Sequence, residues 1–354
     1  MQFVALDVGA CLAFWEKDAQ KIVPNLIETK PTYFPSVPRM FEKIYTLATS
    51  NAEDPEKLRQ AVEVGVKVRQ MREAGQDVPE QLQAGFDQAE EALYANVRGI
   101  FGGSIRQCNT GAAPIAREIL EFFYACGVPV MEGYGMTETA TVATVNTPDA
   151  YRLGSVGKPI PDVEASVAED GELLLRGPNI FKGYYKDEQA TADTLVDGWL
   201  HTGDLGTIDS DGFVYIVGRK KDIIITAGGK NITPANLENG LKHNRWISQA
   251  IVVGDRRPYL VAILTLDPDE APAFAEQHGL AVEDLPESAQ MHAEVQSVVD
   301  AVNSKVGPVE QIKKFAILPR DLTQETGELT PTLKVKRNVV SDKHGGAIDA
   351  LYGK

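Results

Sequence analysis

Two stretches of the chain combine small residues with groups that could bind a nucleotide. The stretch "EGYGMTE" at 132–138 places two glycines around a tyrosine and ends on a threonine and a glutamate. Glycine lets a flat ligand approach the backbone closely, and a hydroxyl beside a carboxylate offers oxygen ligands to a hard cation or contacts to a phosphate. The stretch "TGAAP" at 110–114 supplies further small residues that would let backbone groups read the edge of a base.

Three later stretches add charges that suit the same ligand. The stretch "HTGDLG" at 201–206 places Asp204 on a predicted turn, where a carboxylate could bind two ribose hydroxyls. A cationic run and a glycine-rich bend are combined in "GRKKDIIITAGGKNITP" at 218–234. Far downstream, "LTPTLKVKR" at 329–337 presents Lys334 after a loop that contains proline.

Each of these residues has a plainer explanation when it is taken alone. Tyr134 could be a core residue, Asp204 could form a turn or cap a helix, and Lys334 could be a solvated surface charge. His201 suggests acid–base catalysis, but the sequence shows no partner triad for it. The functional interpretation therefore depends on the motifs occurring together and in this order.

The elements that must position these stretches have the pattern of an α/β protein. A strand, an amphipathic helix and a second strand are predicted over 105–130, with Gly127 ending the helix. The carboxyl ends of such parallel strands are where open α/β sheets bind ligands. A β-rich segment follows, with Asp211 and Gly212 at a hairpin tip, and a compact α/β unit lies beyond Arg219.

The N-terminal part of the chain shows a different pattern of predicted elements. Its first residues, "MQFVALDVGACLAFW", read as a buried strand with no lead-in, so we expect Met1 to be an internal start of a longer protein. A helix is predicted within 17–30. Apolar residues at spacings of three and four, interrupted by "AGQDVPE", predict a charged helical hairpin at 53–98.

Composition excludes several classes of protein. The 354 residues predict about two domains, and 43 % hydrophobic with 24 % charged residues is ordinary for a globular protein. A net charge of −15 argues against broad nucleic-acid binding, which needs a basic face. Cys11, Cys108 and Cys126 form no CxxC pair, which indicates a reduced, cytoplasmic setting without a zinc cluster.

The motifs GAAP, GYGMTET, HTGDLG, GRKKD…GG…ITP and PTLK, in this order, resemble the adenylate-forming superfamily of AMP-dependent synthetases and ligases. "PTYFPSVPRMFEKI" at 31–44, "LTPTLKVKR" and the helical hairpin most resemble its long-chain fatty acyl-CoA synthetase branch. The resemblance implies that 1–218 is the C-terminal part of a large AMP-binding domain, a parallel sheet with helices plus a β-rich subdomain. It further implies a hinge at 219–222 and a small mobile α/β domain at 223–354.

The reaction implied by the resemblance is that of a long-chain fatty acid–CoA ligase that forms AMP. ATP and the acid would give an acyl-adenylate and pyrophosphate, and the coenzyme A thiol would then displace AMP. The implied cofactors and substrates are ATP, Mg²⁺, coenzyme A and a fatty acid. Attack of a carboxylate on the α-phosphate brings two anions together, so cations must stand where that charge develops.

The resemblance also assigns residues by position. Glu138 would ligate Mg²⁺, Thr137 would touch phosphate, and Lys334 would bridge the carboxylate and the α-phosphate. Lys221 would be the pivot of the hinge. The nucleotide-binding positions are Gly111, Ala112, Ala113, Glu132, Gly133, Tyr134, Gly135, Thr137, Asp204, Arg219 and Lys334.

Within that set, Gly111, Ala112 and Ala113 would line the adenine, Tyr134 would stack on it, and Glu132 would lie near its edge. Asp204 and Arg219 would hold the ribose. After adenylation the small domain would swing, so that Lys334 withdraws and Gly228 and Lys230 approach coenzyme A.

One family motif does not occur in the printed residues. The Gly/Ser/Thr-rich phosphate loop followed by lysine is not found, and "TAGGKN" lies in the wrong place for it. We therefore expect an N-terminally truncated member whose activity as an isolated chain is open. The alternatives are another acyl- or aryl-acid adenylating ligase, a fatty acyl-AMP ligase, or a non-catalytic nucleotide-binding or interaction module. Retention of Lys334 and Glu138 argues against the module.

The expected partners are small molecules. The sequence argues against a nucleic-acid partner, and it does not determine the oligomeric state. Peripheral contact with the inner face of a membrane through the hairpin at 53–98 stays open, although its charged faces favour solvation. No apolar run reaches the length of a membrane span.

Overall fold

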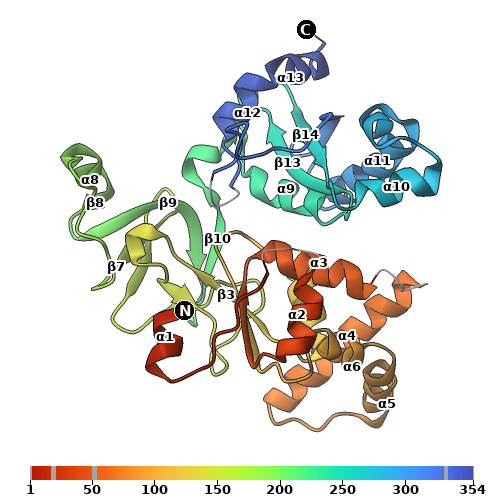
Figure 1. Ribbon diagram of the computed structural model, residues 1–354. Helices are drawn as coiled ribbons and strands as arrows, with labels where there is room; N and C mark the ends of the chain where they lie inside the picture. The colour runs from red at the N-terminus through yellow and green to blue at the C-terminus, as the bar shows by residue number, and fades with distance from the viewer. Residues whose placement is uncertain (1, 17–20, 50–53, 331–333, 354) are drawn as a thin grey trace. The chain divides into compact units, whose positions relative to one another are not determined.

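The computed structural model describes residues 2–16, 21–49, 54–330 and 334–353 (Figure 1). The chain divides into two compact units. The first unit comprises Met1–Ala165, Leu175–Asp193 and Ile208–Tyr215, and the second comprises Ser166–Leu174, Thr194–Thr207 and Ile216–Lys354. The predicted α/β class is confirmed, whereas the predicted boundary at 219–222 stays a prediction.

The first unit is built on a mixed sheet of five strands in sequential order. Its first three strands are parallel, and the last two are antiparallel additions. Ser36, Thr110 and Glu132 occupy one row across the parallel strands. The carboxyl ends of these strands therefore share one edge. The strands are β1 (Tyr33–Ser36), β2 (Gln107–Thr110), β3 (Val130–Tyr134), β4 (Thr144–Val145) and β5 (Lys158–Pro159).

The predicted βαβ unit is confirmed in this sheet. Helix α7 (Arg117–Cys126) joins β2 to β3 and buries seven of its ten residues. Gly127 ends the helix in the left-handed region with φ 78°, and its N–H donates to the carbonyls of Phe123 and Tyr124. This is the ordinary way for a glycine to close a helix, because glycine adopts that conformation without strain.

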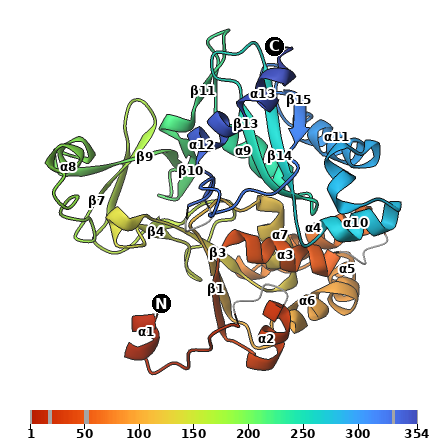
Figure 2. The same ribbon diagram turned by 45° about the horizontal axis from the view of Figure 1, so that its top comes forward.

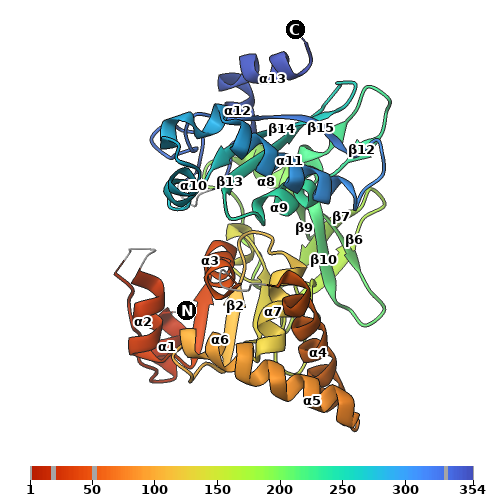
Figure 3. The ribbon, with the colours of Figure 1, turned by 90° about the vertical axis from the view of Figure 1, so that its right-hand side faces the viewer.

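The predicted helical hairpin packs against α7 (Figure 3). Arg69 on the hairpin donates from Nε to the carbonyl of Ala125 at 2.8 Å, and Arg98 donates from Nη1 to the carbonyl of Cys126 at 2.9 Å. Two arginines thus satisfy carbonyls at the end of α7 that have no partner within the helix. This unit also contains α2 (Ile22–Thr29), α3 (Pro38–Thr49), α4 (Pro55–Glu73), α5 (Glu80–Ala89), a π-helix (Glu90–Tyr94) and α6 (Ala95–Ile100).

The predicted N-terminal strand is wrong. The segment begins with helix α1 (Gln2–Asp7), and Leu6 and Phe14 are 70 % and 76 % exposed. A strand needs a neighbour to pair its backbone groups, whereas a helix satisfies them within itself. In the described sheets no strand pairs with this segment, so its apolar composition did not decide its conformation.

A four-stranded sheet in the order β10-β9-β7-β6 has residues in both units. The predicted hairpin tip is confirmed: Gly212 has φ 84°, and the Asp209 N–H donates to the Phe213 carbonyl at 3.0 Å. The elements here are β6 (Glu164–Val167), β7 (Glu172–Arg176), α8 (Glu188–Thr194), β8 (Leu195–Val196), β9 (Trp199–Ile208) and β10 (Val214–Arg219).

The rest of the second unit is an α/β layer (Figure 2). Strands β13 and β14 are antiparallel, β14 and β15 are parallel, and α9 packs against β13. The elements are β11 (Ile224–Ile225), β12 (Asn231–Ile232), α9 (Pro234–Lys242), β13 (Ile247–Val253), β14 (Leu260–Leu266), α10 (Ala271–His278), α11 (Ala289–Asn303), β15 (Ile312–Ile317), α12 (Arg337–Lys343) and α13 (Gly345–Leu351). Among the described helices, none has the length and apolarity to cross a membrane.

Candidate active site

The two small-residue motifs of the first unit lie next to each other at the carboxyl edge of β2 and β3. Thr110 ends β2 opposite Glu132 of β3, so "GAAP" and "GYG" follow from neighbouring strands. A Cβ on Gly111 would stand 2.8 Å from the carbonyl oxygen of Gly133. That distance is too short for any side chain. Gly111 therefore allows the two backbones to approach closely, whereas the predicted approach of a flat ligand to this edge stays a prediction.

Backbone strain marks the same edge. Ala112 has φ 69°, a left-handed conformation that a non-glycine residue rarely adopts, and Ala112 and Ala113 are exposed. Such conformations cost free energy and concentrate where a ligand is bound. A side chain at Gly135 would clash more severely than one at Gly111, because a Cβ on Gly135 would stand 2.1 Å from the carbonyl oxygen of Thr141.

Two buried polar atoms at this edge have no hydrogen-bond partner within the described part of the chain. They are Oε2 of Glu132 and Oγ1 of Thr110, which belong to paired positions of β3 and β2. Burial raises the pKa of Glu132 to about 8, against a smaller opposing effect of the Gly154 N–H. Because a buried polar atom without a partner is costly, these atoms are suited to hydrogen-bond a ligand.

The loop after β3 holds Glu138 in a short turn. The Met136 N–H donates to Thr139 Oγ1 at 2.9 Å, and the Phe181 N–H donates to the Glu138 carbonyl at 2.8 Å. The Tyr184 hydroxyl donates to Glu138 Oε1 at 2.7 Å. The Glu138 carboxylate is thus oriented by a side chain from a distant segment.

The other predicted residues of this motif lie on the same stretch. Tyr134 ends β3, is half-buried and pairs with Thr144 of β4. Thr137 opens the turn and is exposed, so its hydroxyl is accessible to a ligand.

The residues of this stretch fit a magnesium ion. Mg²⁺ is usually held by one or two carboxylates together with phosphate oxygens and waters, rather than by a protein cage. Glu138 supplies such a carboxylate, of which Oε1 already accepts from Tyr184. The described residues contain no group of three or more histidine, cysteine or acidic side chains that could hold a metal by themselves.

In the second unit, Asp204 and Arg219 form an ion pair. Arg219 Nε lies 3.2 Å from Asp204 Oδ1, and the Asp204 side chain is 8 % exposed. The predicted turn at Asp204 is wrong, because Asp204 lies within β9. Gly203 before it has φ 70°, which breaks the regular strand conformation locally. The glycine therefore indicated a local irregularity of a strand rather than its end.

His201 has a structural partner. Its Nδ1 lies 3.1 Å from Glu172 Oε2, which also accepts from Lys220 Nζ at 3.1 Å, while Glu172 Oε1 accepts from the Gly203 N–H. Burial raises the pKa of Glu172, but these three donors together outweigh it, so the pKa lies below its usual value. His201 thus belongs to an ion-pair cluster that supports the strand of Asp204.

The predicted hinge and coenzyme A residues lie on exposed loops of the second unit. Lys221 is in a 3-10 turn, Lys220–Asp222. Gly228 and Lys230 lie in the bend between β11 and β12, where the Lys230 N–H donates to Thr226 Oγ1 at 3.2 Å. Lys230 Nζ lies 3.5 Å from Glu310 Oε1.

Lys334 is exposed, on the loop before α12. Its N–H donates to Thr330 Oγ1 at 3.0 Å, and its carbonyl accepts from the Thr330 N–H at 2.8 Å. Residues 331–333 of the same motif lie outside the described residues. The convergence of Lys334 and Asp204 with Tyr134 and Glu138 around one ligand stays a prediction.

Two supporting residues could not be found from the sequence. Tyr184 lies 46 positions from Glu138, and Asn179 donates from Nδ2 to the carbonyls of Thr139 and Val142. Both belong to "GPNIFKGYYKD", which carries no charge pattern that would connect it with the turn. Only the packing of the chain brings them there.

Solved structures with this fold include nucleotide-binding enzymes. The adenylation and carrier didomain of the carboxylic acid reductase from Segniliparus rugosus, solved with AMP, superposes with a TM-score of 0.66 at 22 % identity over 96 % of this chain and 44 % of that one. The O-succinylbenzoate coenzyme A synthetase of Bacillus subtilis, also solved with AMP, gives 0.61 at 23 % identity over 95 % and 56 %. The chain therefore has the fold of adenylation domains.

Sequence comparison gives the family. The family model described as "AMP-binding enzyme" matches residues 1–185, and "AMP-binding enzyme C-terminal domain" matches residues 221–354. The chain belongs to the AMP-binding enzyme family. It is 41 % identical, over 95 % of its length, to the long-chain-fatty-acid–CoA ligase FadD15 of Mycobacterium bovis, and 36 % identical, over 97 %, to the long-chain-fatty-acid–CoA ligase ACSBG2 of Gallus gallus. It spans 57 % and 49 % of the lengths of these two proteins.

Proposed function

We propose that the chain acts as a long-chain fatty acyl-CoA ligase that forms AMP. A carboxylate oxygen of the acid attacks the α-phosphorus of ATP, the bond to pyrophosphate breaks, and an acyl-adenylate results. The coenzyme A sulfur then attacks the acyl carbonyl carbon, and AMP leaves. The observation that carries this proposal is the similarity to two curated long-chain ligases over at least 95 % of the chain.

The edge of β2 and β3 is the proposed adenine site. Gly111, Ala112 and Ala113 line the base, and Tyr134 stacks on its face between Gly133 and Gly135. Support comes from the close backbone approach at Gly111, the strained Ala112 and the two buried atoms without partners. The Glu132 carboxyl, with its raised pKa, holds a proton near neutral pH and can donate it in a hydrogen bond to a ring nitrogen.

Glu138 and Thr137 are the proposed phosphate-side residues. Glu138 would hold a Mg²⁺ ion, which neutralises phosphate charge as the leaving group departs. Tyr184 fixes the Glu138 carboxylate before any ligand arrives. Thr137 donates its exposed hydroxyl to a phosphate oxygen.

Asp204, Arg219 and Lys334 are the proposed ribose and reaction-centre residues. Asp204 accepts from the ribose hydroxyls, and its ion pair with Arg219 orients the carboxylate. Lys334 supplies a compact positive charge between the acid and the α-phosphate. Its exposed side chain on a loop suits a group that approaches for one step and withdraws for the next.

For the second step, Gly228 and Lys230 form part of the proposed coenzyme A site. Lys221 is the proposed pivot within the hinge at 219–222, between a large domain ending at 218 and a small domain at 223–354. Support comes from the family match that begins at residue 221 and from the exposure of all three residues. We also propose a cytoplasmic protein with small-molecule partners. Peripheral membrane contact through the helical hairpin is the alternative, and the charged faces of the hairpin favour solvation instead.

The reaction is tested by incubating the purified chain with ATP, Mg²⁺ and palmitate, octanoate or benzoate, with and without coenzyme A. We expect AMP and acyl-CoA, with palmitate preferred over benzoate. AMP release without thioester would identify a fatty acyl-AMP ligase, and preference for benzoate an aryl-acid ligase. If there is no turnover, and calorimetry shows no heat with a nonhydrolysable acyl-AMP analogue, the ligase proposal is wrong.

A further inference from the structure

Lys334 lies on a loop whose two legs are joined by the backbone. Leu329 and Val335 form an antiparallel bridge, and the Lys336 N–H donates to the Glu328 carbonyl at 2.8 Å. The loop carrying the lysine therefore begins at Glu328 and ends at Lys336. The Lys334 backbone forms hydrogen bonds with Thr330, and the Lys334 side chain is exposed.

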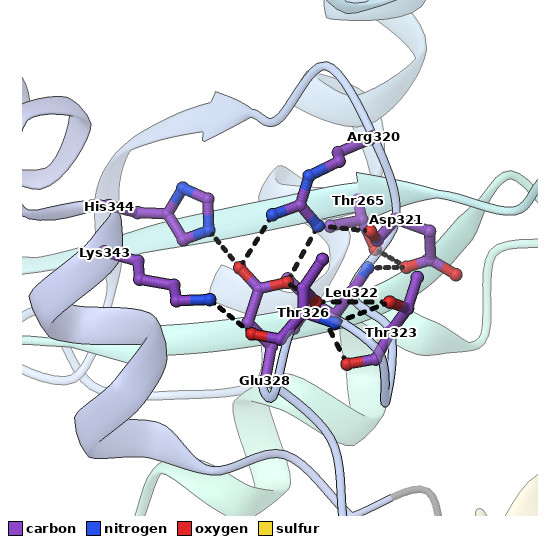
Figure 4. A network of polar contacts seen from close by, with 9 residues as sticks. All are labelled: Thr265, Arg320, Asp321, Leu322, Thr323, Thr326, Glu328, Lys343 and His344. Atoms are coloured by element: carbon purple, nitrogen blue, oxygen red, sulfur yellow. Dashed lines mark hydrogen bonds and ion pairs between the residues drawn. The ribbon is translucent and has the colours of Figure 1, made fainter.

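The first residue of this loop has a fully buried carboxylate. The Glu328 side chain is 0 % exposed, and its oxygens accept from Arg320 Nη1 at 2.8 Å and Nη2 at 3.1 Å. His344 Nε2 lies 2.7 Å from Glu328 Oε1, and the Thr326 hydroxyl donates to Oε2. Figure 4 shows these side chains converging on Glu328.

The partners come from three segments around the loop. Arg320 follows β15, Thr326 precedes Glu328, and His344 follows α12. Lys343, beside His344, also donates to the Thr326 carbonyl. One carboxylate thus connects the chain entering the Lys334 loop with the helix that follows it.

Apolar packing holds the surroundings of this network. Leu322, Leu329 and Val340 are buried in one cluster with Ile251 and Ile263 of the sheet. The hydrogen bonds of Arg320 lower the pKa of Glu328 to about 2 despite its burial, so the group is an anion at neutral pH. A buried anion paired in this way fixes geometry, because movement of the loop would leave it without its partners.

We infer that Glu328 is a positioning residue for Lys334: its buried carboxylate, held by Arg320, His344 and Thr326, fixes the base of the loop that delivers the lysine. This inference rests on the proposed role of Lys334 in adenylation. A lysine side chain has four rotatable carbons, so its charge reaches a defined point only if its backbone is fixed. The Glu328 backbone carbonyl and side chain together fix both legs.

The test is a double-mutant cycle on the two half-reactions. Glu328→Gln keeps the shape and removes the charge, and we expect it to slow acid-dependent exchange of pyrophosphate into ATP by about ten- to a hundredfold. Thioester formation from supplied acyl-adenylate should change by less than about twofold. In a Lys334→Ala background, Glu328→Gln should have no further effect on exchange, because its action passes through the lysine.

The matched control is Glu270→Gln. Glu270 is also a carboxylate paired with an arginine of the second unit, accepting from Arg245 Nε at 2.8 Å, but it lies before α10 and not at the Lys334 loop. The control should leave pyrophosphate exchange unchanged. If the effect came only from losing an arginine–carboxylate pair, both variants would be less stable, and both half-reactions would slow in each of them. That effect would persist in the Lys334→Ala background.

A second readout does not depend on turnover. Hydrogen exchange at the amides of Thr330, Lys334 and Lys336 should accelerate in Glu328→Gln and not in Glu270→Gln. Unchanged exchange at these amides, or an undiminished effect of Glu328→Gln without Lys334, overturns the inference. If Lys334→Ala itself leaves pyrophosphate exchange intact, the proposed role of Lys334 fails instead, and the two failures are distinguishable.

Discussion

Glu132 is a carboxyl group whose surroundings favour the neutral form. It lies on β3 beside Thr110, and burial raises its pKa from 4.5 to about 8. In the folded chain it therefore keeps its proton in the range where the unfolded chain has lost it. Because the folded state binds this proton more tightly than the unfolded state, the free energy of unfolding declines as the pH rises from about 4.5 toward 8.

Substitution of Glu132 by glutamine tests this directly. Because glutamine does not titrate, the variant should lose the Glu132 contribution to pH dependence, which is at most about 1.4 kcal/mol per pH unit. Urea denaturation of both proteins at about pH 5, 6, 7 and 8, which roughly spans the interval between the two pKa values, gives the dependence of the unfolding free energy on pH for each protein. Identical slopes would show that the Glu132 pKa is not raised.

Tyr184 orients Glu138, the carboxylate proposed to hold Mg²⁺. Removing its hydroxyl in Tyr184→Phe frees one oxygen of Glu138 to rotate, at a cost of about 1 kcal/mol for the lost hydrogen bond. We expect the Mg²⁺ concentration for half-maximal adenylation to rise about fivefold. The matched control is Tyr185→Phe, since Tyr185 is 88 % exposed. Equal Mg²⁺ dependence in the two variants would contradict the proposed orientation of Glu138.

At the scale of elements, the helical hairpin stabilises the end of α7. A Cβ on Gly127 would stand 2.6 Å from Arg69 Nη2, in addition to the strain of its left-handed backbone. Gly127→Ala should therefore cost about 1–2 kcal/mol for the conformation and about 1–3 kcal/mol more for displacing the Arg69 hydrogen bond.

Gly75→Ala is the matched control, because Gly75 also has a positive φ but nothing within 4 Å of its Cβ. Both free energies of unfolding can be measured by urea denaturation. An equal loss in the two variants would mean that Arg69 does not hold the end of α7.

The elements that sequence reasoning predicted are those with a local signal. The spacing of apolar residues predicted α4, α5 and α7, and Gly127 marked a helix end, because these depend on the helical period and on glycine. The predictions of an N-terminal strand and of a turn at Asp204 were wrong, because whether a segment forms a strand depends on pairing with a neighbouring strand. Tyr184 and the Glu328 network arise from contacts between distant or irregular segments, which no period encodes.

At the scale of the whole molecule, the residues proposed for nucleotide binding and catalysis are divided between the two units. The first unit provides Tyr134 and Glu138, and the second provides Asp204 and Lys334. A lysine on an exposed loop is needed only while charge builds between acid and α-phosphate. The two half-reactions should therefore depend on Lys334 unequally.

The most direct measurement compares both half-reactions in the unaltered chain and in Lys334→Ala. Pyrophosphate exchange reports the first step, and thioester formation from supplied acyl-adenylate reports the second. We predict that exchange falls by about a hundredfold or more while thioester formation stays within about threefold. A parallel loss of both steps, or exchange that survives without the lysine, would contradict the assignment of Lys334 to adenylation.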